Sequence, residues 1–270
     1  SGKAIPDAMA DSPVQKALVL LKCLADYGEP IGVKRLAEDT GLNISTVHRL
    51  LRLLAEERMV SFDPQTRLYG IGTDCIRFAI SVLGGDSLAA RVRPVIADLA
   101  HTLQETCAYS VYEPDTFTKA IAAVERGPHQ LGYNFDVGRR DGIHAGASGK
   151  AILAFLPDAD IETMFKTVTL EVTAENTIVD PDALRRDIAE IRARGYATSL
   201  GERVPGAGFG IGAPVYGPDG RIVGSVVVTV PLFRWKKKNL GWMSKAVMDC
   251  GRVLSGIAAA EVSAEAEAGA

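Results

Sequence analysis

Three short amphipathic segments, the last two separated by a glycine turn, constrain the fold of this chain more than any other feature. Apolar residues recur at helical spacing over residues 14–26, 33–39 and 43–57, which predicts three helices. Between the second and the third, Thr40-Gly41-Leu42 forms a tight turn in which glycine can adopt a positive φ. Two short helices joined in this way are typical of a helix-turn-helix.

Two short β-type runs follow these segments and predict a hairpin. The runs cover residues 59–62 and 67–71, and Asp63-Pro64 opens a turn between them. A hairpin directly after a helix-turn-helix is a wing, which places Arg67 where it can reach a phosphate. We therefore expect an N-terminal all-α winged helix-turn-helix, although three-helix clusters also occur in many proteins that do not bind DNA.

The charge of the chain does not by itself favour a nucleic-acid partner. The formal net charge is -3, and residues 13–82 are close to neutral, with nine Lys and Arg against eight Asp and Glu. DNA binding must therefore depend on where individual cations point. On the third predicted helix, hydroxyls and arginines lie off the apolar face formed by Val47, Leu50, Leu51 and Leu54.

The cysteines and the apolar runs limit the cellular context. The four cysteines are widely scattered, without a CxxC pair or a histidine at metal-ligand spacing, which predicts free thiols in a reducing compartment. No apolar run approaches the ~20 residues that a membrane span needs, and the N-terminus lacks the pattern of a signal peptide. We expect a cytoplasmic protein with no metal, no cofactor and no membrane partner.

From Cys107 onward, strand-like and helical runs alternate. Gly217-Pro218-Asp219-Gly220 is a strong turn, and the run 223–230 is apolar enough for a strand buried on both faces. The pattern predicts a C-terminal α+β domain with a mostly antiparallel sheet. The predicted strands cover residues 107–112, 118–125, 208–216 and 221–230, and the predicted helices cover 88–105, 148–156, 181–194 and 240–261.

These elements divide the chain into four segments. Residues 12–71 form the winged helix-turn-helix, and residues 72–86 form a linker helix. Residues 87–262 form the second domain. Residues 263–270, rich in Ala and Glu, are expected to be a disordered tail.

The stretch from His144 to Ala151 is a turn of small residues that leads into a helix. Free N–H groups and the positive end of the helix dipole make such a turn an anion site. The stretch matches neither GxxxxGK[ST] nor GxSxG, so it is neither a phosphate loop nor a nucleophile elbow. A Ser148–Lys150 nucleophile–base pair stays open. We expect, however, that Lys150 points outward without an acid partner and that His144 is structural.

Residues 12–72 closely resemble the DNA-binding half of the IclR family of regulators. The most specific part of the match is Ser45-Thr46-Val47-His48-Arg49-Leu50-Leu51. The resemblance implies that the helix from Asn43 enters the major groove of double-stranded operator DNA. Which side chains contact bases stays open, because arginine binds both bases and phosphates. The candidates for DNA contact are Lys34, Ser45, Thr46, His48, Arg49, Arg52 and Arg67.

The resemblance extends over nearly the whole chain and implies that the second domain is a GAF-like effector domain. In similar proteins the small-residue turn binds the carboxylate of the effector through main-chain N–H groups. The binding positions carried over to this chain are Ala147, Ser148, Ser199, Gly208, Gly210, Val227 and Thr229. In relatives that bind very small keto-acids, an Asp, a Cys and two Ser occupy four of these places.

This chain differs from those relatives at all four places, and the difference changes the effector that we expect. Here Ser199, Gly210, Val227 and Thr229 stand at the four places, which adds room and removes hydrogen-bonding groups. We expect an organic acid or amide that is bulkier and more apolar than a two- or three-carbon acid, such as an aromatic one. The side chains that can supply ring contacts are Tyr133, Phe135 and Phe209, although aromatic residues near a sheet more often belong to the core. The loop 206–213 is one residue longer than in relatives, so the alignment at 206–210 can shift by one.

The resemblance also implies an assembly. Paired half-sites in DNA need paired recognition helices, so a homodimer that binds a near-palindromic operator is expected, and a dimer of dimers stays open. A protein of another class, an enzyme that processes a small molecule and carries an appended helical domain, also stays open. The favoured function is sequence-specific regulation of transcription, controlled by a small effector.

Overall fold

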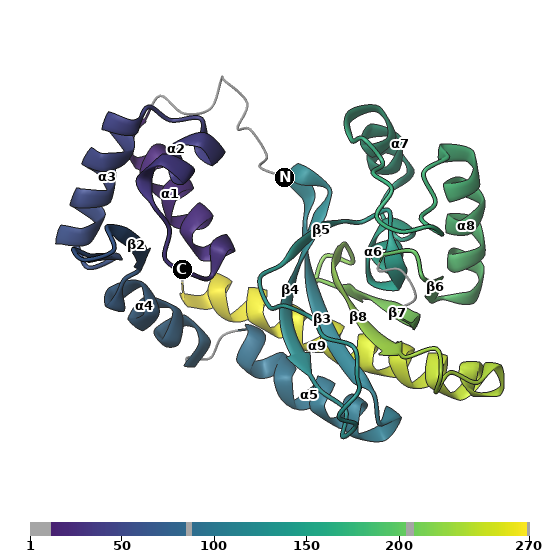
Figure 1. Cartoon of the computed structure of the whole chain (residues 1–270). Helices are drawn as coiled ribbons and strands as arrows, with labels where there is room; N and C mark the ends of the chain where they lie inside the picture. The colour runs from purple at the N-terminus through teal and green to yellow at the C-terminus, as the bar shows by residue number, and fades with distance from the viewer. Residues whose placement is uncertain (1–11, 85–87, 204–207, 269–270) are drawn as a thin grey trace. The chain divides into compact units, whose positions relative to one another are not determined.

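The structure is a computed structural model that describes residues 12–84, 88–203 and 208–268. These residues form two compact units, and the boundary between the units falls between residues 85 and 86 (Figure 1). Among the helices of the described ranges, none is both long and apolar enough to cross a membrane.

The N-terminal unit begins with three helices, as predicted. Helix α1 covers Pro13–Tyr27, α2 covers Val33–Thr40 and α3 covers Ile44–Glu56. Gly28 and Gly41 end α1 and α2 with φ angles of 67° and 68°. Glycine adopts this left-handed conformation readily because it has no Cβ to clash with the backbone, so each helix ends where the sequence supplies a glycine.

A two-stranded hairpin follows α3. Strand β1 (Val60–Asp63) pairs antiparallel with β2 (Leu68–Ile71). Between them the carboxylate of Asp63 accepts hydrogen bonds from the N–H of Gln65 at 2.8 Å and from the hydroxyl of Thr66 at 2.7 Å. These bonds to the charged form, the one from Thr66 above all, lower the pKa of Asp63. Asp63, which predicted the turn from the sequence, therefore stabilises it through these hydrogen bonds.

The apolar faces of the three helices and the hairpin share one core. Helix α4 (Thr73–Gly84) is the last element of the unit. Burial of these apolar side chains is the main favourable term for so small a unit. The buried members of the core are Leu20, Leu24, Ile31, Val33, Leu36, Ala37, Val47, Leu50, Leu51, Val60 and Tyr69.

The C-terminal unit is built on a six-stranded sheet in the order β5-β4-β3-β8-β7-β6, and every neighbouring pair is antiparallel. This confirms the expected α+β class with an antiparallel sheet. The strands are β3 (Thr106–Glu113), β4 (Thr118–Glu125), β5 (Arg140–Gly142), β6 (Ala197–Leu200), β7 (Phe209–Tyr216) and β8 (Ile222–Val230). The helices are α5 (Leu88–Leu103), α6 (Gly146–Leu153), α7 (Asp158–Thr167), α8 (Pro181–Arg194) and α9 (Leu240–Ala268), with 3-10 turns at Pro114–Thr116 and Lys237–Asn239.

Helices cover both faces of this sheet. On one face α5 and α9 pack against Ile211, Val226 and Val228 of the central strands (Figure 1). On the other face α6 lies on β6, β7 and β8, and a second core joins α6 to α7 and α8. Strand β8 is buried along almost its whole length because it has neighbours on both faces, as its apolar sequence predicted.

The structure corrects three expectations about the elements. Residues 263–268 continue α9 and are not a disordered tail, because Ala and Glu are strong helix formers. Helix α6 begins at Gly146 and not at Ser148. Strands β5 and β6 and helix α7 were not predicted. Parts of the predicted linker (85–86), pocket loop (206–207) and tail (269–270), and the first residue of the predicted second domain (87), lie outside the described residues.

Candidate functional site

The C-terminal unit has a pocket between the start of α6 and the sheet. Its empty volume is about 460 Å³ when the open solvent at its mouth is counted. The lining residues are Lys119, Tyr133, Phe135, Ala145, Gly146, Ala147, Ser148, Ser199, Gly201, Glu202, Arg203, Gly208, Gly210, Val227 and Thr229. The structure therefore brings the seven binding positions carried over from the family to one place, together with Tyr133 and Phe135.

The first turn of α6 supplies backbone donors at the pocket. Gly146 has a φ of 77°, so the turn needs a glycine at this position. Its N–H donates to Oε2 of Glu202 at 3.2 Å. The next N–H groups, those of Ala147 and Ser148, have no acceptor within the helix because they belong to its first turn. Together with the helix dipole, they favour an anion at this end of the pocket.

The hydroxyl of Ser148 holds α6 on the sheet. It lies 3.0 Å from the hydroxyl of Ser110 on β3 and 2.8 Å from that of Ser225 on β8. All three serines are buried. A hydroxyl engaged on both sides in this way is structural, so the part of Ser148 that remains for a ligand is its backbone N–H.

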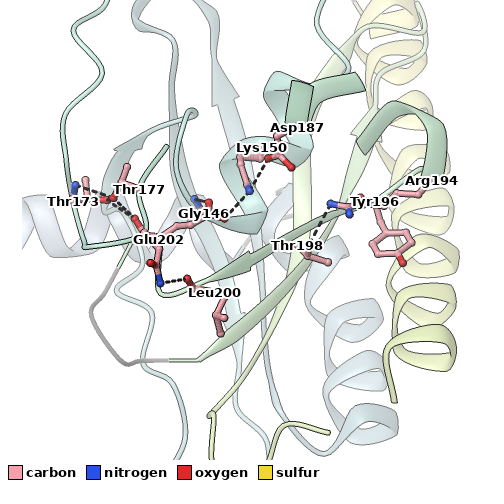
Figure 2. A network of polar contacts seen from close by, with 11 residues as sticks. Gly146, Lys150, Thr173, Thr177, Asp187, Arg194, Tyr196, Thr198, Leu200 and Glu202 are labelled. Atoms are coloured by element: carbon pink, nitrogen blue, oxygen red, sulfur yellow. Dashed lines mark hydrogen bonds and ion pairs between the residues drawn. The ribbon is translucent and has the colours of Figure 1, made fainter. Parts of the chain in front are cut away.

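Lys150 is buried and paired with two acids, contrary to the expectation that it points outward without an acid partner. Its side chain is 2% exposed, and its Nζ lies 2.7 Å from Oε1 of Glu202 and 2.8 Å from Oδ2 of Asp187 (Figure 2). The prediction failed because every residue of α6 is buried, and because both acids lie far along the chain. With Ser148 bonded to serines and Lys150 to carboxylates, the contacts do not form a nucleophile–base pair.

Glu202 connects the first turn of α6 to the loop before α8. Burial raises the pKa of its carboxyl even though Lys150 stabilises the charged form. Its carbonyl oxygen accepts hydrogen bonds from the hydroxyls of Thr173 at 2.8 Å and Thr177 at 2.5 Å (Figure 2). These contacts fix the segment that contributes Glu202 and Arg203 to the pocket.

The glycines of β7 allow α6 to approach the sheet, and this corrects the idea that Gly210 adds room for a ligand. A Cβ at Gly210 would lie 2.7 Å from Oγ of Ser199 and 3.0 Å from Cβ of Ala147. A Cβ at Gly212 would lie 2.4 Å from the carbonyl oxygen of Ala147. Side chains at Gly210 and the backbone of α6 at Gly212 already fill the space that these glycines leave.

The floor of the pocket is apolar, and one wall is aromatic. Val227 and Ala147 belong to a small buried cluster against which Phe135 packs. The rings of Tyr133 and Phe135 have centroids 4.7 Å apart. Phe209 does not join them, because alternate residues of β7 face opposite sides of the sheet, and it stacks on Trp235 at 3.9 Å. The ring contact expected from Phe209 is therefore wrong.

The sequence did not indicate the cationic side chains of the pocket, Lys119 and Arg203. Lys119 is 2% exposed on β4, two residues before the buried Ile121. The one signal in the sequence was this spacing, which places a lysine on the same face of a strand as an apolar residue. Arg203 lies in the segment after β6, for which no structure was predicted.

Helix α3 has a buried apolar face and an exposed polar face. Val47, Leu50 and Leu51 are buried, and Arg52 makes only a loose 3.7 Å ion pair with Glu56. Most of the candidate DNA contacts are exposed, and Thr46 is half-buried. The exposed candidates are Lys34 on α2, Ser45, His48, Arg49 and Arg52 on α3, and Arg67 at the end of the hairpin turn.

Comparison with known protein families gives a match for each unit. Residues 13–64 match the IclR helix-turn-helix domain, and residues 80–256 match the bacterial transcriptional regulator IclR C-terminal domain. Among curated proteins, the HTH-type transcriptional regulator BhcR of Paracoccus denitrificans is 29% identical over 255 residues. That alignment covers 94% of this chain and 90% of BhcR.

Solved structures share the fold. An IclR transcriptional regulator from Alicyclobacillus acidocaldarius superposes with a TM-score of 0.81 at 23% identity, covering 90% of this chain and 97% of that one. An IclR homologue from Microbacterium hydrocarbonoxydans, solved in complex with 4-hydroxybenzoate, superposes with a TM-score of 0.74 at 18% identity. It covers 91% of this chain and 98% of that one.

Proposed function

Because this chain belongs to the IclR family of bacterial transcriptional regulators, we propose that α3 lies in the major groove of an operator while the pocket holds the controlling effector. The family consists of DNA-binding regulators with an effector-binding C-terminal domain and not of enzymes, which removes the alternative of an enzyme with an appended helical domain. The observation that carries the proposal is the exposed polar face of α3 opposite its buried apolar face.

The side chains that touch DNA are proposed on the basis of exposure and position. Ser45, His48 and Arg49 lie in the first half of α3, which is the part of a recognition helix that meets base edges. Arg52, Lys34 and Arg67 are exposed cations suited to phosphates. Thr46 is half-buried and completes the set.

The proposed assembly is a homodimer, or a dimer of dimers, on double-stranded operator DNA in the cytoplasm. A two-fold assembly presents two copies of α3 to the two halves of a near-palindromic site. The effector then acts by having different affinities for two arrangements of the assembly, so that its binding changes the separation of the paired recognition helices.

The proposed effector is a small organic acid or amide with an apolar body. The apolar cluster around Val227 and the Tyr133–Phe135 wall suit an aromatic ring. The relative crystallised with 4-hydroxybenzoate makes this compound a useful first probe.

Substitution of Arg49 tests the DNA-binding part of the proposal. Arg49→Ala is expected to weaken binding to the promoter DNA of the regulated gene by about 1–3 kcal/mol, the range for loss of a bidentate base contact. Fluorescence anisotropy with the promoter duplex and with a scrambled duplex measures the effect at one fixed salt concentration.

A matched control separates the loss of this contact from the loss of one positive charge on the protein. Arg221→Ala removes an exposed arginine from a turn of the other unit and should leave the affinity unchanged. If the wild-type protein showed no preference for the promoter over the scrambled duplex, the proposed function would be wrong.

A further inference from the structure

Three cations surround one carboxylate beside the pocket. Lys119 and Asp141 are directly opposite each other on β4 and β5, with Nζ of the lysine 3.8 Å from Oδ2 of the aspartate. Arg203 pairs with the same oxygen, and Nε of Arg139 lies 3.3 Å from Oδ1. Across the ranges that the structure describes, no other carboxylate lies within ion-pair distance of Lys119 or Arg203.

The unbalanced positive charge borders the cavity. Lys119 is almost fully buried and Arg203 is largely buried, and both line the pocket, whereas Asp141 lies behind them. Burial, together with the nearby charge of Arg203, lowers the pKa of Lys119 to about 8. This shift has the direction expected of an ammonium group whose charge the protein does not fully balance. Residues 204–207, Val-Pro-Gly-Ala, add no side-chain charge.

Arg203 also lies beside the backbone donors of α6. A Cβ on Gly146 would be 3.4 Å from Cδ of Arg203. The positive end of α6 and the guanidinium group therefore act on the same part of the pocket. The acid of the lining, Glu202, does not offset them directly, because its carboxylate is paired with Lys150 and with the N–H of Gly146.

The remainder of the lining carries no charge. It consists of the apolar floor at Val227 and Ala147, the rings of Tyr133 and Phe135, and small or hydroxyl-bearing residues. A ligand that fits both parts has an apolar body and an anionic group. An amide of the same shape would fill the apolar part and leave the charge of Lys119 unbalanced.

We propose that Lys119 and Arg203 together bind the anionic group of the effector, so that the pocket selects organic acids over the corresponding amides. This inference rests on the proposed function and narrows it. It names two residues that set the charge of the ligand, neither of which the resemblance to the family indicated.

The test compares matched acids and amides on the full chain. Isothermal titration calorimetry at pH 7 uses 4-hydroxybenzoate and 4-hydroxybenzamide, followed by a panel of aromatic and aliphatic acids with their primary amides. The acid of a pair is expected to bind at least tenfold more tightly than its amide. Lys119→Met and Arg203→Gln should each weaken binding of the acid at least tenfold and leave binding of the amide unchanged.

The control variant is Lys166→Met, which removes an exposed lysine of α7 away from the pocket and should change neither affinity. Methionine nearly matches lysine in length, so Lys119→Met should unfold at the wild-type temperature or above. If that variant failed to fold, Arg203→Gln alone would test whether the cations of the pocket bind the anionic group.

Three results would overturn the inference. The first is an amide that binds as tightly as its acid, the second is retention of acid affinity in both pocket variants, and the third is a panel in which no acid binds. Operator binding, measured separately by anisotropy, shows whether the DNA-binding part of the proposed function survives each of these outcomes.

Discussion

Lys119 is the residue whose protonation state most affects the charge of the pocket. Its ammonium group faces Asp141 across the β4–β5 pair, Arg203 from the segment after β6, and Arg139 from the segment before β5. Burial opposes ionisation of Asp141, but the hydrogen bond and charge of Arg203 prevail and lower its pKa. Asp141 therefore stays ionised at neutral pH, and Lys119 is the member of the cluster that titrates near it.

Affinity for an organic acid is expected to fall as the pH rises above about 8. The bound anion favours protonated Lys119, so the pKa of this lysine is higher in the complex than its value of about 8 in the free protein. Well below pH 8 the lysine is charged in both states, and the affinity should be constant. Between the pKa of Lys119 in the free protein and its pKa in the complex, a rise of one pH unit should weaken binding by up to about tenfold. Calorimetry from pH 6.5 to pH 9.5 at constant ionic strength measures this.

Lys119→Met provides the control for this titration. Its affinity for the acid should be weaker than that of the wild type at pH 7 and should not change over the same range. A wild-type affinity that stays constant up to pH 9.5 would show that Lys119 does not bind the anionic group.

At the scale of elements, the function of the pocket depends on how closely α6 lies against β7. Gly212 on β7 pairs with Val227 on β8 and with Ala197 on β6, so it has a strand on either side. The carbonyl oxygen of Ala147 occupies the space above it. The absence of a side chain at Gly212 therefore sets the position of the backbone donors at the start of α6.

Gly212→Ala is expected to lower the free energy of unfolding by about 1–3 kcal/mol, as overpacking does. The added methyl group would lie 2.4 Å from a backbone oxygen, so the first turn of α6 has to move. Urea denaturation measures the loss, and calorimetry with the acid should show weaker binding, because the donors of Ala147 and Ser148 are displaced.

Gly256→Ala is the matched control for this substitution. It adds a methyl group to a glycine of α9 that has no heavy atom within 4 Å of the added Cβ. Replacing glycine by alanine inside a helix should stabilise the protein by up to ~1 kcal/mol. A Gly212→Ala variant as stable as wild type, with unchanged affinity for the acid, would contradict this role of the close contact.

Sequence periodicity was sufficient to predict the helices and strands that have a strong apolar repeat. The amphipathic repeat and the proline at its start gave α8 over residues 181–194, the range that the structure has. Strand β5 has only three residues, too few for a periodic signal, and so the pairing of Asp141 with Lys119 could not be predicted. The burial of Lys150 was missed for a related reason, since its partners come from distant segments.

The resemblance to the family supplied what periodicity could not. It brought Ser199 of β6, Gly210 of β7 and Thr229 of β8 into one site, although they come from three strands. It did not indicate what replaces the polar groups that this chain lacks there. The positive charge of the pocket comes from Lys119 and Arg203, which both pair with Asp141.

At the scale of the whole molecule, the proposed function requires the two units to influence each other. One unit carries the exposed face of α3, and the other carries the pocket. An effector can change operator binding only if its affinity differs between the operator-bound and the free protein. Coupling of this kind is reciprocal, because the two binding steps form a thermodynamic cycle.

The factor by which an acid changes operator affinity should therefore equal the factor by which the operator changes affinity for the acid. Anisotropy with the operator duplex, with and without saturating acid, gives the first factor, and calorimetry of the acid, with and without saturating duplex, gives the second. Lys119→Met should bind the operator within about twofold of wild type in the absence of acid, and it should need at least tenfold more acid than the wild type for the same response. Arg49→Ala should weaken operator binding and keep wild-type affinity for the acid. If Lys119→Met responded to the same acid concentrations as the wild type, the pocket would not be the site through which the effector controls DNA binding.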